Sequence, residues 1–189
     1  ERAHLFQEMG RLAFRAGDNA TAVAWGERAL AELPPLEAGR SRAAGEVDAA
    51  ARNTLGVALA RLGRTAEAVQ HIETAVAEAE AQGLLHAACR GYTNLGVLYA
   101  TLDPQRGIDT CLRGLRAAQR VGDLGFESRL YANLAVAYCA LTSRCEAATS
   151  TARSGECPAS GTIVSSQARM RSCSTWKRRL RRRIPRSAA

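Results

Sequence analysis

Apolar residues recur at intervals of three and four through residues 3–148, as they do along one face of an amphipathic helix. Glycine, proline or aspartate separates these stretches, and such residues commonly begin or end helices. No stretch shows the alternation and turn residues of a β-hairpin. The pattern therefore predicts an all-α fold, with helices over residues 3–16, 18–33, 46–62, 65–82, 84–102, 104–121 and 124–141.

Short polar residues mark the predicted helix starts. Asp18 or Asn19 is expected to cap the second helix, Thr65 the fourth and Asp103 the sixth, because a side-chain oxygen there accepts free backbone N–H groups. Pro104 fits the first position of the sixth helix, since the N–H that proline lacks has no helical partner there.

One phrase recurs along the chain. It is YTNLGVLYATL at 92–102 and YANLAVAYCAL at 131–141, with weaker copies RNTLGVALARL at 52–62 and QEMGRLAFRAG at 7–17. The last three copies begin 40 and 39 residues apart, and a fixed period of this length is the signature of a repeat array. The units of such an array bury their apolar faces against one another. We therefore predict an array over residues 1–148, with units at about 3–34, 46–82, 84–121 and 124–148.

Small residues recur in each unit where two helices must approach closely, for example Gly56 with Ala68 and Gly96 with Gly107. A leucine precedes Gly56 and Gly96, and a leucine or tyrosine follows three residues later. With these motifs the chain resembles the tetratricopeptide repeat (TPR) family over residues 3–147. The resemblance implies a right-handed superhelical array of antiparallel helix hairpins, a TPR-like α-solenoid.

The period of 39 or 40 residues is longer than the usual TPR period of about 34. In this respect the chain resembles the repeat regions of large bacterial signalling ATPase regulators. That resemblance implies a cytoplasmic, non-enzymatic scaffold or sensor segment of a larger transcriptional or signalling protein, which binds a protein or peptide. The open end of such an array would also allow self-association.

By the same resemblance, the first helices of successive units line a concave groove, and residues at matching positions form ladders. Asparagine amides in such a ladder could hold the backbone of an extended peptide, and arginine could clamp a carboxylate. The alternative is that the asparagines serve packing between units and the arginines are solvated charges. The predicted peptide-binding groove consists of Asn53, Val57, Arg90, Asn94, Val97, Arg129, Asn133 and Val136.

The formal net charge of +8 is concentrated at the C-terminal end. Residues 149–189 are rich in serine and arginine and have no helical or strand periodicity, so we expect a disordered basic tail. Three interpretations of this tail stay open. Its clustered cations could bind nucleic acid or a membrane surface, it could be an address signal, or it could be an off-frame translation. Nucleic-acid binding through the tail is the alternative function.

No catalytic, metal-binding or cofactor-binding motif is found in the sequence. His4, His71 and His86 fall in different helices, and the six cysteines form no CxxC pair. Phosphate-binding glycine motifs are missing as well. The cysteines before residue 140 fall on apolar helical faces, which favours a reducing, cytoplasmic compartment. No apolar run is long enough to span a membrane.

Overall fold

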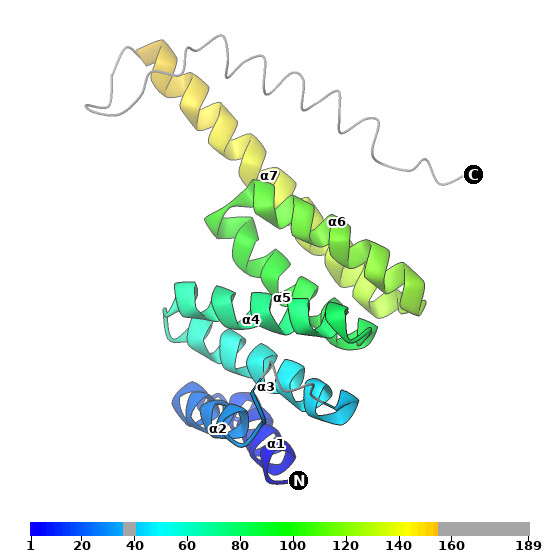
Figure 1. Cartoon of the computed structure of the whole chain (residues 1–189). Helices are drawn as coiled ribbons and strands as arrows, with labels where there is room; N and C mark the ends of the chain where they lie inside the picture. Colours follow the sequence, from blue (N-terminus) through cyan, green and yellow to red (C-terminus); the bar gives the residue numbers. More distant parts are fainter. Residues whose placement is uncertain (36–40, 155–189) are drawn as a thin grey trace. The chain divides into compact units, whose positions relative to one another are not determined.

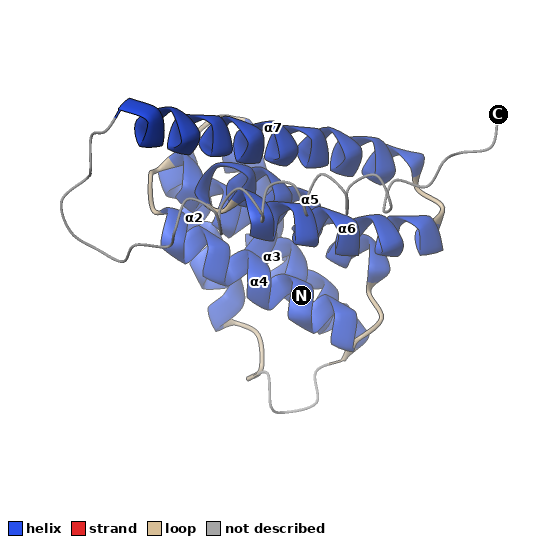
Figure 2. Cartoon of the chain, turned by 90° about the horizontal axis from the view of Figure 1, so that it is seen from above, coloured by secondary structure: helices blue, strands red, loops and turns tan. Residues whose placement is uncertain are grey.

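Helices make up all of the regular structure in the described part of the chain. The computed structural model describes residues 1–35 and 41–154, and within these ranges there are seven helices and no strand (Figure 2). The predicted all-α class is therefore confirmed for these residues. The helices are α1 (Arg2–Arg15), α2 (Asn19–Ala31), α3 (Arg42–Arg61), α4 (Thr65–Ala81), α5 (Leu85–Leu102), α6 (Pro104–Val121) and α7 (Leu124–Ser154).

The chain divides into two compact units, Glu1–Ala140 and Leu141–Ala189. The first unit contains α1 to α6 and the part of α7 that ends at Ala140. Within it, each helix from α1 to α6 packs against the next one in the sequence, in the order of the colours from blue to green in Figure 1. The helix α3 also contacts both α1 and α5, so the first helices of neighbouring hairpins touch one another directly.

Two of the predicted helix starts are confirmed. Asp18, rather than Asn19, caps α2, because its Oδ1 accepts the backbone N–H of Thr21 at 3.0 Å. Asp103 caps α6 by accepting the backbone N–H of Arg106 at 3.2 Å, and Pro104 occupies the first helical position. These aspartates satisfy donors that a helix start otherwise leaves without a partner.

One predicted start and one predicted cap are wrong. The helix α3 begins at Arg42 rather than at 46, because Ser41 caps it by accepting the backbone N–H of Ala44 at 3.3 Å. Thr65 is the first residue of α4 and not its cap. Arg64 occupies the N-cap position and makes no side-chain capping hydrogen bond.

The predicted close approaches of helices are confirmed. A methyl group added to Gly56 on α3 would collide with the side chain of Ile72 on α4 and lie 3.0 Å from the carbonyl oxygen of Ala68. A methyl group added to Gly96 on α5 would lie 2.7 Å from Cys111 Sγ on α6. Both distances are too short for a relaxed contact, so only glycine fits at these positions without a shift of the partner helix or of the side chain that it presents.

The core of the first unit forms two clusters. One joins α2, α3 and α4 around Leu55 and Leu59, and the other extends from α3 to α7 around Ile72, Tyr92 and Leu130. Many of the remaining buried side chains are alanines. Because a buried alanine removes less apolar area from water than leucine does, we expect polar contacts between helices to contribute a substantial share of the stability.

The helix predicted over residues 124–141 extends further than expected. The helix α7 runs without a break from Leu124 to Ser154, so no turn divides residues 124–148, the fourth predicted unit, into two helices. The segment LTSRC at 141–145 contains no glycine or proline that would end a helix. Residues 149–154 of the predicted tail are helical, and residues 155–189, on which the other tail predictions fall, lie outside the described residues.

Candidate functional site

The three asparagines of the predicted groove join neighbouring hairpins. Asn94 on α5 donates through Nδ2 to Oδ1 of Asn53 on α3 at 3.2 Å. Asn53 in turn donates to the carbonyl oxygen of Ala49 at 2.9 Å. One repeat later, Asn133 on α7 donates to the carbonyl oxygen of Thr93 on α5 at 2.9 Å. The two inter-helix bonds span 41 and 40 residues, so they repeat with the period of the sequence.

These hydrogen bonds favour the packing interpretation of the asparagines. Asn53 was predicted to contact a ligand, but only 2% of its surface is exposed and both ends of its amide are hydrogen-bonded within the chain. Asn94 and Asn133 are half-buried, and each has its Nδ2 directed to a neighbouring helix. The asparagines thus hold α3, α5 and the first part of α7 in register.

The remaining groove residues are more accessible. Val97 on α5 and Val136 on α7 are 54% and 55% exposed, although valine is a residue that proteins usually bury. Arg90 and Arg129 are exposed and precede these valines by seven residues, which is two turns of the same helix face. We call these four residues, together with the half-buried Val57 on α3, the first-helix face.

The position of α7 against α5 brings the two rows of this face together. Asn133 lies so close to Gly96 that a methyl group on this glycine would be 3.3 Å from Asn133 Nδ2. Val97 follows Gly96 directly, and Val136 lies one turn after Asn133. Arg129 is held in place by its own helix, since its Nε donates to the carbonyl oxygen of Gly125 at 3.1 Å.

A second group of polar contacts was missed by the sequence analysis. On the other side of α5, Tyr99 donates its hydroxyl to Glu73 Oε1 on α4 at 2.6 Å, and Arg106 on α6 donates to the same oxygen at 2.7 Å. The guanidinium carbon of Arg106 also lies 4.4 Å from the centre of the Tyr99 ring. Three helices therefore meet at one carboxylate.

The same arrangement recurs two turns away. Tyr92 donates its hydroxyl to Glu80 Oε1 at 2.5 Å, and Arg113 donates to Glu80 Oε2 at 2.9 Å. Burial, followed by the hydrogen bond to glutamate, raises the pKa of both tyrosine hydroxyls well above the ordinary value, so that each remains a donor. The sequence contains one signal from which these two clusters could have been predicted. The residues of each pair are seven positions apart: Glu73 and Glu80, Tyr92 and Tyr99, Arg106 and Arg113.

These two clusters border a pocket of about 370 Å³ between α4, α5 and α6. Its two glutamates and two arginines are paired with one another, and Asp109 also lines it. We therefore assign the two clusters a structural role, the alignment of the second helices α4 and α6 over α5.

The described residues offer no grouping of histidine, cysteine, aspartate and glutamate that could hold a metal ion. His4 and His86 are exposed and His71 is half-buried. Cys89 and Cys111 are buried, as expected from their apolar faces, whereas Cys139 is exposed. Among the same residues, no helix combines the length and the apolar character that crossing a bilayer requires.

Comparison of the chain with protein-family models, with curated proteins and with solved structures found no match.

Proposed function

We propose that this chain is a non-enzymatic protein-binding module, a TPR-like helical repeat array that holds a peptide or protein segment on its first-helix face. The observation that carries this proposal is the pair of exposed valines, Val97 and Val136, which occupy matching positions in consecutive repeats. Exposed apolar side chains that gather on one surface are typical of protein interaction sites.

The chemistry of the face suggests the kind of partner. The valines would contact apolar side chains of the ligand, and Arg90 and Arg129 would pair with its carboxylates. The asparagine bonds support this proposal indirectly, because they hold the two rows in register before the ligand arrives. A preorganised surface binds more tightly, since less conformational entropy is lost on binding.

In the cell, we propose that the module acts as the sensor or scaffold segment of a larger cytoplasmic signalling or transcriptional regulator. This part of the proposal is supported by the repeat period and the motif residues described above. Self-association through an open end of the array stays a prediction. The exposed Leu5 and Leu12 on α1 are the apolar residues that would serve it there.

Selection from a random displayed-peptide library on the immobilised chain would test the proposed function. A selected peptide would be labelled with a fluorophore and its Kd measured by fluorescence anisotropy. The double variant V97D/V136D should raise the Kd at least about tenfold, because it places charges where apolar contacts form, and each 1.4 kcal/mol corresponds to a factor of ten. The variant R90A/R129A should weaken the binding of peptides that carry acidic residues.

The matched control is L5D/L12D, which introduces the same two charges at leucines that are 57% and 59% exposed on α1. It should leave the Kd within about twofold, and circular dichroism should show equal helix content in all variants. Equal loss of affinity in V97D/V136D and L5D/L12D would refute the first-helix face as the binding site. The proposed function itself would be refuted if no selected peptide bound specifically, that is, if the unlabelled form never displaced the labelled form of the same peptide.

A further inference from the structure

The helices α4 and α6 carry opposite charges, and the charges balance along only part of their length. Glu73 and Glu80 on α4 pair with Arg106 and Arg113 on α6. Beyond Arg113, α6 presents two more exposed arginines, Arg116 and Arg120, while α4 ends at Ala81. Among residues 1–35 and 41–144, whose side chains the structure describes, neither of these two arginines forms an ion pair with a carboxylate.

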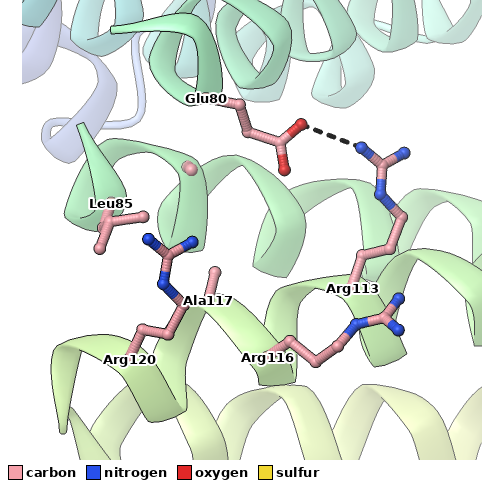
Figure 3. A pocket seen from close by; sticks show the side chains of 7 residues that line it. Glu80, Leu85, Arg113, Arg116, Ala117 and Arg120 are labelled. Carbon is pink, nitrogen blue, oxygen red and sulfur yellow. Dashed lines mark hydrogen bonds and ion pairs between the residues drawn. The ribbon is translucent and has the colours of Figure 1, made fainter. Parts of the chain in front are cut away.

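These arginines line an open pocket of about 420 Å³ at the C-terminal end of α6. Figure 3 shows the Arg113 and Arg120 side chains on either side of Ala117, with Arg113 turned toward Glu80. The pocket also has an apolar part, formed by Leu85 and Ala88 on α5 together with Ala117. Its volume lies within the range of small-molecule sites, about 300–1,000 Å³.

The charge of the pocket is not balanced by the described residues that line it. Three arginines and one glutamate line it, which leaves an excess of two positive charges. Glu80 cannot compensate further, because its two oxygens already accept hydrogen bonds from Tyr92 and Arg113. Arg116 and Arg120 are one helical turn apart, a spacing at which like charges repel. A ligand with two negative charges would remove both the excess and the repulsion.

We propose that this pocket binds the phosphate dianion of a small phosphate monoester, with Arg116 and Arg120 as its main ligands. Guanidinium groups bind phosphate oxygens through paired, charge-assisted hydrogen bonds. The apolar part of the ligand lies against the half-buried Leu85 and the small exposed part of Ala117, neither of which has a hydrogen-bonding side chain.

This site is separate from the first-helix face. Leu85 and Ala88 lie on the side of α5 opposite Arg90 and Val97, since an α-helix turns once in about 3.6 residues. The phosphate site and the proposed peptide-binding face therefore depend on different residues, and each can fail without the other.

Isothermal titration calorimetry of the full chain with phenyl phosphate tests the proposal. At pH 8 the probe is a dianion, because the second phosphate pKa is about 6. We expect one binding site for phenyl phosphate. Benzoate, which has the same ring but one charge, should bind at least about tenfold more weakly. The variant R116A/R120A should bind phenyl phosphate at least about tenfold more weakly than the unmodified chain does. R116K/R120K should recover part of the affinity, because lysine keeps the charge without the planar fork.

The matched control is R15A/R42A, which removes two exposed arginines outside the pocket and should bind phenyl phosphate as the unmodified chain does. All four arginines are exposed, so helix content should be unchanged. Unaltered affinity in R116A/R120A, or an equal loss in R15A/R42A, would overturn the site. Tighter binding of an unrelated phosphoserine peptide than of phenyl phosphate would overturn the small-molecule assignment.

Discussion

Replacement of Asn94 by alanine should separate the packing role of the asparagines from a binding role. The Nδ2 of Asn94 donates to Oδ1 of Asn53, which is almost fully buried and uses its own Nδ2 on the carbonyl of Ala49. Asn94→Ala would leave this buried oxygen without its donor. A buried polar group that loses its partner costs about 1–3 kcal/mol, so the free energy of unfolding should fall by that amount.

Asn133→Ala provides an internal comparison. The acceptor of Asn133 is the carbonyl oxygen of Thr93, which lies within α5 and also accepts a helical hydrogen bond. Loss of this second bond leaves no acceptor entirely without a donor, so we expect a cost of only about 0.5–1.5 kcal/mol. The structure thus predicts that Asn94→Ala destabilises the chain more than Asn133→Ala does.

Urea denaturation followed by circular dichroism measures both changes. A double-mutant cycle with Asn53→Ala isolates the Asn53–Asn94 pair, and we expect a coupling energy of about 1 kcal/mol. If Asn94→Ala and Asn133→Ala left stability unchanged but abolished binding of a selected peptide, the asparagines would be ligand-binding residues. A greater loss of stability in Asn133→Ala than in Asn94→Ala would also contradict the packing role.

Three further predictions concern the core and its titratable groups. Gly56→Ala should lower the free energy of unfolding, measured by urea denaturation, by about 1–3 kcal/mol, because the added methyl group collides with Ile72. Unchanged stability would mean that α3 and α4 can separate without cost. Iodoacetamide at pH 8 should label the exposed Cys139 much faster than Cys111, and peptide mass spectrometry measures both rates. Only the thiolate reacts, and burial raises the pKa of the Cys111 thiol to about 11. Equal labelling rates would contradict the burial of Cys111. Burial lowers the pKa of His71, so the unfolded chain binds more protons at this site than the folded chain does. The stability that neutral His71 contributes is therefore fully present above the unfolded pKa of about 6.5 and is lost as the pH falls through the folded pKa. Urea denaturation between pH 7.5 and pH 5.5 should therefore show a smaller loss of stability in His71→Gln than in the unmodified chain, and an identical pH dependence would refute this account.

Local signals in the sequence were sufficient for most of the helices. The periodicity of apolar residues predicted α1 to α6 with errors of a few residues at their ends, and Asp18 and Asp103 were identified as caps. The largest local error concerns α7, which was predicted to end at residue 141 and continues to Ser154. Helix formation depends on residues within about four positions of one another, and the segment at 141–145 contains nothing that interrupts it.

The candidate site was predicted only in part. The physical reason differs from the one that applies to α7. The repeat period placed Asn94, Asn133, Val97 and Val136 at matching positions, but it did not show which of them face a neighbouring helix. That depends on how hairpins some 40 residues apart lie against each other, which is decided by close contacts such as the one between Gly96 and Asn133.

The sequence by itself determined that the chain is helical, where most helices begin and end, and that its units repeat. Only the tertiary structure decided that the asparagine amides join neighbouring helices while the valines remain exposed. It also brought together the Tyr92 and Tyr99 clusters and, among the residues whose side chains are described, left Arg116 and Arg120 without an ion pair to a carboxylate. Periodicity encodes which side of a helix is apolar, whereas the partner of a polar side chain depends on residues far away in the sequence.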